Sequence, residues 1–109
     1  MRTVGAVLFA AMATCAEAAP ADCLLEVRGM TYIDGMCDFE ADSDGSFTVA
    51  AGDYFATVLI DTPNRGAGYW NENPRAQHAH SPLGALRRKG ACWSNDQAQI
   101  CAWKPGERR

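Results

Sequence analysis

Long apolar segments and helical stripes are both missing from this 109-residue sequence. One uncharged, mostly apolar run covers ten residues, 4–13, whereas a helix that crosses a bilayer needs about 20. No segment places hydrophobic residues at the helical spacing over ten or more positions. These absences argue against a permanent membrane helix and against a helical domain.

The apolar run has the three parts of a secretory signal peptide. Arg2 supplies a positive charge before it, and the small residues Ala16 and Ala18 form an A-x-A cleavage signal after it. We therefore expect residues 1–18 to be removed on export, which leaves a single domain of residues 19–109. The predicted location is the periplasm or the extracellular medium.

The sequence has five cysteines, an odd number that becomes even if Cys15 leaves with the signal peptide. The alternative, a lipoprotein signal with Cys15 as lipid anchor, fits poorly with the threonine before it. Four cysteines in a short exported chain are typical of two disulfides with three possible pairings, of which Cys23–Cys37 and Cys92–Cys101 is the simplest. A short-loop disulfide adds about 3 kcal/mol, which matters in so small a domain.

Basic residues are scarce in the first half of the exported chain. Residues 19–61 contain nine acidic residues and one basic residue, and residues 62–109 contain three acidic and eight basic ones. We expect the halves to attract each other electrostatically. The net acidic balance and export argue against nucleic acid as a partner, and no membrane association is expected after signal removal.

Alternating and β-branched residues predict extended structure throughout this domain. The expected strands cover residues 23–28, 31–41, 46–50, 54–61, 85–93 and 99–103. Gly35 suggests a bulge or bend. If Cys92 and Cys101 lie opposite each other in the last hairpin, Trp93 should face Ile100.

Residues 62–84 contain many turn formers and are predicted to be mainly irregular, with one strand near residues 68–71. The predicted fold is mainly β: a small antiparallel sheet or partly closed barrel of six to eight short strands with two disulfides.

Several stretches carry a resemblance to known proteins: "DCLLEVRGMTYIDGMCDFE", "DGSF", "GYW", "HAHSPLGALRRKGACW" and "ICAW". They resemble a group of small exported bacterial proteins, over nearly the whole exported chain, and this implies an exported domain with two disulfides but no particular activity. A looser similarity links the chain to periplasmic lysozyme inhibitors, which are small disulfide-bearing β-barrels. "RGAGYWNEN" resembles part of their inhibitory loop, but function does not follow from a shared fold alone.

His78 and His80 are two residues apart, so on extended backbone both imidazoles can reach one metal ion. Two ligands are too few for a structural zinc site, which needs four. A catalytic role would need a nucleophile or acid held against a histidine, and no nucleophile elbow or paired-carboxylate pattern is present. We therefore expect no enzyme and no cofactor; the histidines order a loop or, alternatively, bind a metal.

Tyr69 and Trp70 have two interpretations. In a small domain, large aromatic side chains usually belong to the core. Alternatively, they protrude from a glycine-flanked loop and act as binding anchors. The leading hypothesis is an exported, non-catalytic binding module that acts as the inhibitor or partner of an envelope or extracellular protein, through Tyr69, Trp70, His78 and His80. The alternatives are a periplasmic metal-binding protein and a structural envelope protein without a discrete ligand.

Overall fold

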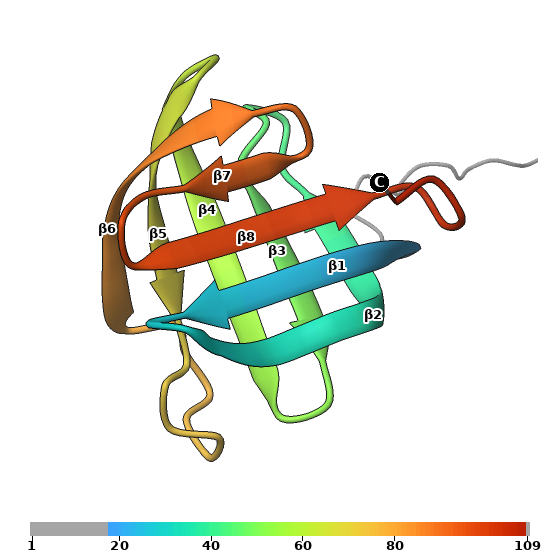
Figure 1. The fold of residues 1–109 in the computed structure, drawn as a ribbon, viewed down its shortest axis with the longest axis vertical. Helices are drawn as coiled ribbons and strands as arrows, with labels where there is room; N and C mark the ends of the chain where they lie inside the picture. Colours follow the sequence, from blue (N-terminus) through green and yellow to red (C-terminus); the bar gives the residue numbers. More distant parts are fainter. Residues whose placement is uncertain (1–17, 109) are drawn as a thin grey trace, which may run out of the picture.

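The computed structural model describes residues 18–108, which form eight antiparallel strands closed into a barrel (Figure 1). The strands are β1 (Ala19–Val27), β2 (Met30–Ala41), β3 (Phe47–Ala51), β4 (Tyr54–Thr62), β5 (Arg65–Trp70), β6 (Ser81–Lys89), β7 (Cys92–Ser94) and β8 (Ala98–Trp103). Each strand pairs with the next in sequence, and β8 pairs back onto β1. The predicted mainly β, antiparallel fold is confirmed, and the barrel is fully closed.

The predicted signal peptide and Cys15 lie outside the described residues, except for Ala18. Within the described part, no helix is long and apolar enough to cross a bilayer.

The barrel interior is filled by every second residue of the strands. In β1, Cys23, Leu25 and Val27 are buried, while the residues between them are half-buried and face outward. Side chains alternate between the two faces of a strand, so one face of each strand builds the core. Val49 of β3 and Ile100 of β8 are fully buried in the same core.

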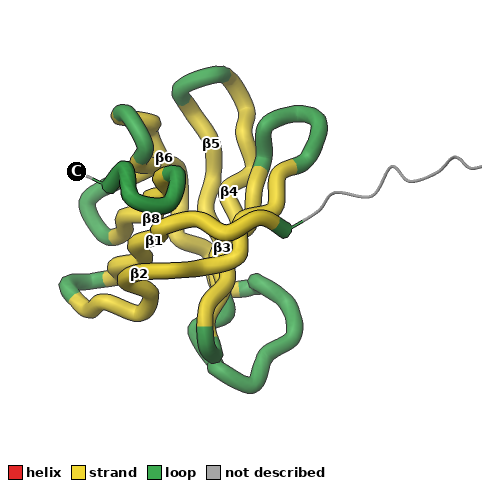
Figure 2. The backbone as a smooth tube through the Cα atoms, turned by 90° about the vertical axis from the view of Figure 1, so that its right-hand side faces the viewer, coloured by secondary structure: helices red, strands yellow, loops and turns green. Residues whose placement is uncertain are grey.

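The two ends of the barrel differ. The connections at residues 28–29, 52–53, 71–80 and 95–97 join one end, which we call the loop end. The opposite end, which we call the terminal end, carries the turns at residues 42–46, 63–64 and 90–91, the start of β1 and the end of β8. Figure 2 shows these connections as green segments around the yellow strands.

Aromatic rings fill the barrel at the loop end. Tyr32 lies edge-on to Trp70 and to Tyr54, with ring centroids 4.7 and 4.9 Å apart. All three residues lie close to the loop-end termini of their strands. Edge-to-face contact is one of the two arrangements that aromatic pairs prefer, and offset stacking is the other.

The prediction of an irregular segment over residues 62–84 was wrong in two places. Only Pro63 and Asn64 form the turn between β4 and β5, and β6 begins at Ser81. The glycines of β5 are needed for close packing: a Cβ on Gly68 would lie 2.7 Å from the Leu86 side chain. The same glycines made a strand look like a loop in the sequence.

Of the two features predicted at Gly35, a bulge or a bend, the bulge lies elsewhere. Gly35 pairs in register with Cys23, and the shift between β1 and β2 falls between Leu25 and Glu26. Two further shifts fall between Ile60 and Thr62, in the pairing of β4 with β5, and between Gly68 and Tyr69, in the pairing of β5 with β6. The glycine in the sequence of β2 therefore does not mark the position of the bulge.

Both predicted disulfides are present, Cys23–Cys37 and Cys92–Cys101. Cys92 lies directly opposite Cys101, and Trp93 pairs with Ile100, which confirms the predicted register. Two disulfides are compatible with an oxidising compartment outside the cytoplasm.

The C-terminal segment joins the basic half of the sequence to the acidic half. Arg108 forms ion pairs with Asp22 and Asp34, and its guanidinium lies over the Trp103 ring, 5.0 Å from the centroid. The hydrogen bond to Asp34 is the largest of the effects that raise the pKa of Arg108, whereas desolvation lowers it. The predicted attraction between the halves thus has a specific contact here.

Candidate functional site

The connection between β5 and β6, residues 71–80, is the longest loop of the described chain and projects from the loop end (Figure 1, gold). Pro74 lies within it, and proline disfavours regular pairing. Polar residues make up most of its length. It is therefore built as a surface segment that the barrel presents to solvent.

Asn71 attaches the first residue of this loop to the barrel. The residue is 1 % exposed. The Oδ1 atom accepts a hydrogen bond of 2.7 Å from the Phe55 N–H, and the Nδ2 group donates one of 2.8 Å to the Asp53 carbonyl. The Asn71 N–H donates to the Phe55 carbonyl at 3.2 Å. These bonds continue the pairing of β4 with β5 past the last residue of the strand.

Glu72 and Arg28 connect the loop to the turn between β1 and β2. Arg28 Nη2 lies 3.5 Å from Glu72 Oε2, and both side chains are well exposed. The Arg28 N–H donates a hydrogen bond of 2.7 Å to the Gln97 carbonyl, in the turn between β7 and β8. Arg28 adopts a φ of 50°, a conformation rare for residues other than glycine. Three loop-end connections are therefore held together around this residue.

The middle of the loop contains its own turns. The Asn73 side chain accepts a hydrogen bond from the Arg75 N–H at 3.0 Å, and the Asn73 carbonyl accepts one from the Ala76 N–H at 2.9 Å. Asparagine commonly stabilises turns in this way. The loop thus has internal hydrogen bonds as well as attachments at its start.

His78 and His80 are both exposed, and their rings are stacked. The His80 N–H donates to the His78 carbonyl at 3.1 Å, which closes a three-residue turn around Ala79. The ring centroids lie 5.3 Å apart and the ring planes differ by 10°. The two imidazole rings therefore form one stacked pair that is exposed to solvent.

This geometry bears on the metal hypothesis. The acceptor lone pair of an imidazole nitrogen lies in the plane of its ring, so an ion bound by both rings must lie close to both planes. Two nearly parallel, stacked planes do not meet between the rings, and a ring rotation would be needed for chelation. Within residues 18–108, no three His, Cys, Asp or Glu residues are grouped in a way that could hold a metal ion.

Tyr69 and Trp70 lie in β5 and not in a loop. Trp70 is 2 % exposed and packs against Tyr32 and Tyr54, so it is a core residue and the prediction of a protruding anchor is corrected for it. Tyr69 is half-buried on the opposite face of the strand, between Thr57 and Pro82 in the register. The stretch "RGAGYW" is likewise strand.

Sequence reasoning missed Asn71, Arg28 and Glu72. A buried asparagine and an exposed one look alike in the sequence, and an ion pair 44 residues apart leaves no local pattern.

No family model, curated protein or solved structure matches this chain.

Proposed function

We propose that this chain is an exported, non-catalytic binding module of the periplasm or extracellular medium, and that the loop of residues 71–80 contacts a protein partner. The supporting observation is that this loop is held to the barrel by the buried Asn71, while its stacked histidine pair stays in solvent. Neither imidazole contributes to the core. A rigid scaffold that presents an ordered loop pays little conformational entropy on binding.

The site as proposed consists of His78, His80 and the half-buried Tyr69, with Arg28 and Glu72 at its border. Trp70 supports it from inside the barrel. Arg28 and Glu72 neutralise each other, so the border has no large net charge. A partner would bind mainly through contact with the stacked histidine pair and through hydrogen bonds to the polar loop.

The test is affinity capture with the oxidised domain, residues 19–109, immobilised and exposed to envelope extract and to secreted proteins. The variant His78→Ala with His80→Ala removes the exposed pair. Met36→Ala with Leu59→Ala is the matched control, because it also removes two exposed side chains, from the barrel wall. We expect a partner that the wild type and the wall variant retain and the loop variant loses.

Retention of the same partner by the loop variant would refute the site. Absence of any protein that binds the oxidised, folded domain better than the denatured domain would refute protein binding and favour a structural envelope protein.

The metal alternative rests on the closeness of the two imidazoles and requires one ring to rotate out of the stacked arrangement. It predicts that Zn²⁺, Cu²⁺ or Ni²⁺ binds with micromolar or tighter affinity in calorimetry and that the double histidine variant does not bind. Affinity should fall as protons compete for the ring nitrogens. The same affinity in the double variant would remove this alternative.

A further inference from the structure

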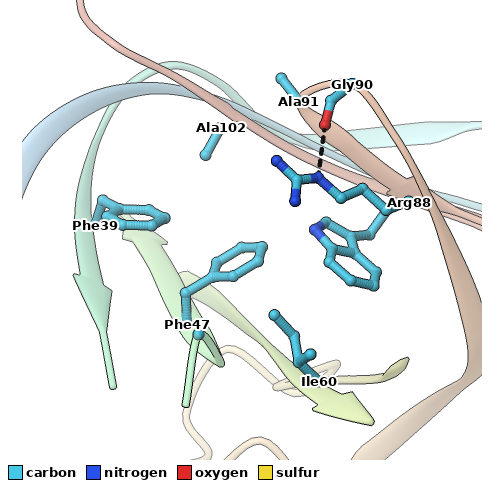
Figure 3. A pocket seen from close by; sticks show the side chains of 9 residues that line it. Phe39, Phe47, Ile60, Arg88, Gly90, Ala91 and Ala102 are labelled. Atoms are coloured by element: carbon cyan, nitrogen blue, oxygen red, sulfur yellow. Dashed lines mark hydrogen bonds between the residues drawn. The ribbon is translucent and has the colours of Figure 1, made fainter. Parts of the chain in front are cut away.

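The interior of the barrel is open at the terminal end. A hollow of about 210 Å³ lies there, with apolar walls from β2, β3, β4, β7 and β8 (Figure 3). The wall residues are Phe39, Phe47, Ile60, Trp93 and Ala102. Phe39 and Phe47 are stacked with ring centroids 5.3 Å apart. The loop end is filled by aromatic rings, whereas this end leaves apolar surface open to solvent.

Arg88 is the one cationic side chain among the residues that line this hollow. It lies directly opposite Trp93 in the pairing of β6 with β7. Opposed residues share a face of the sheet, and Trp93 is buried in the core, so Arg88 belongs to the inner face. Figure 3 shows its guanidinium beside the hollow. Arg87, the preceding residue, belongs to the outer face.

The Arg88 guanidinium has free donors. Its Nε–H donates to the Gly90 carbonyl at 3.1 Å, which holds the group at the mouth of the hollow. The terminal Nη groups have no acceptor among the hydrogen bonds of the described residues, and none of the ion pairs in this part of the chain includes Arg88. The turn at residues 42–46 also lies at this end of the barrel. Its Asp44 carboxylate accepts a hydrogen bond of 2.8 Å from the Ser46 N–H and forms no ion pair with Arg88.

A second apolar hollow of about 280 Å³ lies next to the first one. Phe39 and Ala102 line both, so the two hollows meet at these side chains. The second hollow runs along the start of β1 and the end of β8, past Pro20 and Trp103. Apolar surface thus extends outward from a guanidinium placed at the barrel mouth.

We propose that the terminal end binds an amphipathic carboxylate, with its carboxylate on Arg88 and its apolar body against Phe39 and Phe47. A guanidinium offers two parallel N–H donors, which match a carboxylate. A dry cavity of about 150 Å³ holds a benzene ring, so the first hollow has room for a phenyl group or a short acyl chain. A longer chain continues into the second hollow. This site is separate from the loop of residues 71–80 and does not depend on the function proposed for that loop.

The experiment uses two matched pairs of probes, octanoate with octanamide and 3-phenylpropionate with 3-phenylpropanamide. Each is titrated into the ¹⁵N-labelled, oxidised domain, and amide shifts give the affinity and the location. We expect shifts at Phe47, Arg88, Gly90 and Ala102. Each carboxylate should bind at least about tenfold more tightly than its amide, because hydrogen bonds between charged groups are stronger than neutral ones.

Three variants locate the effect. Arg88→Met keeps an apolar stem and should reduce the carboxylate to the affinity of the amide, whereas Arg87→Met, one residue away on the outer face, should leave the difference unchanged. Ala102→Leu fills the junction of the hollows and should weaken all four probes. If Arg88→Met does not fold, Arg88→Lys, which keeps the charge but loses the paired donors, should bind the carboxylates less tightly than the wild type.

Equal affinity for carboxylates and amides would overturn the proposal. Shifts confined to the outer wall, or the same loss in Arg87→Met as in Arg88→Met, would do so as well.

Discussion

Replacement of Asn71 by alanine tests how the loop of residues 71–80 is held. The substitution removes the acceptor of the Phe55 N–H and the donor to the Asp53 carbonyl, at 2.7 and 2.8 Å. The alanine side chain can replace neither bond. Both backbone groups must then find water or stay unpaired.

The magnitude follows from the burial of these groups. A buried polar group left without a partner costs about 1–3 kcal/mol. Asp53 is exposed, so its carbonyl can bond to water, whereas Phe55 is half-buried and its N–H is harder to satisfy. We therefore expect a loss of about 2–3 kcal/mol in the free energy of unfolding. In a domain of this size that corresponds to a fall of about 10–20 °C in Tm.

Urea denaturation followed by tryptophan fluorescence and by far-UV circular dichroism measures this loss, with Asn73→Ala as control. Asn73 is an exposed asparagine of the same loop, so its removal should change stability by less than about 0.5 kcal/mol. Hydrogen exchange should also become faster across residues 71–80 in the Asn71 variant, whereas the Asn73 variant should affect mainly the Arg75 N–H, which loses its acceptor. A stability within about 0.5 kcal/mol of the wild type would refute the anchoring role.

Further predictions concern the core and the disulfides. Trp70→Ala should lower the free energy of unfolding by about 3–5 kcal/mol in urea, while Tyr69→Ala should cost under about 1 kcal/mol; equal losses would contradict their placement on opposite faces. Gly68→Ala should lower the free energy of unfolding by about 1–3 kcal/mol through crowding of the core. An unchanged free energy of unfolding would show that the neighbouring side chains move to make room for the methyl group. Replacement of both Cys23 and Cys37 by serine should lower the free energy of unfolding by about 3 kcal/mol, because the unfolded chain gains entropy. A loss smaller than the one caused by removal of the shorter bridge, Cys92–Cys101, would contradict this reason.

Much of the fold could be predicted because each strand of a barrel buries every second residue. β1 to β4 combine alternating apolar residues with clear turn signals, so their approximate bounds follow from the sequence. The pairing of Cys92 with Cys101 follows from hairpin register. Barrel closure was harder, because the contact of β1 with β8 joins the two ends of the domain and has no local signal.

The first half of β5 and the start of β6 were missed for a different reason. Gly66 and Gly68 indicate a loop by composition, but here a side chain at either position would collide with neighbouring atoms. Gly84, with a φ of 90°, lies within β6. Close packing of one strand on the next cannot be distinguished from a flexible turn without knowledge of the partner strand.

The candidate site was predicted only in part. The sequence singled out the histidines as a possible loop pair, and their exposure agrees with a loop. The role of Asn71 and the inward direction of Arg88 both depend on strand register. A shift of one residue would reverse the faces of Arg87 and Arg88, and three consecutive basic residues give no hint of which one turns inward.

The most direct test of the proposed binding surface is a footprint of the captured partner on the ¹⁵N-labelled domain. Amide shifts or exchange protection should concentrate in residues 71–80 and extend to Arg28 and Gln97, which the loop-end hydrogen bonds connect to this region. A footprint confined to the barrel wall or to the terminal end would contradict the account.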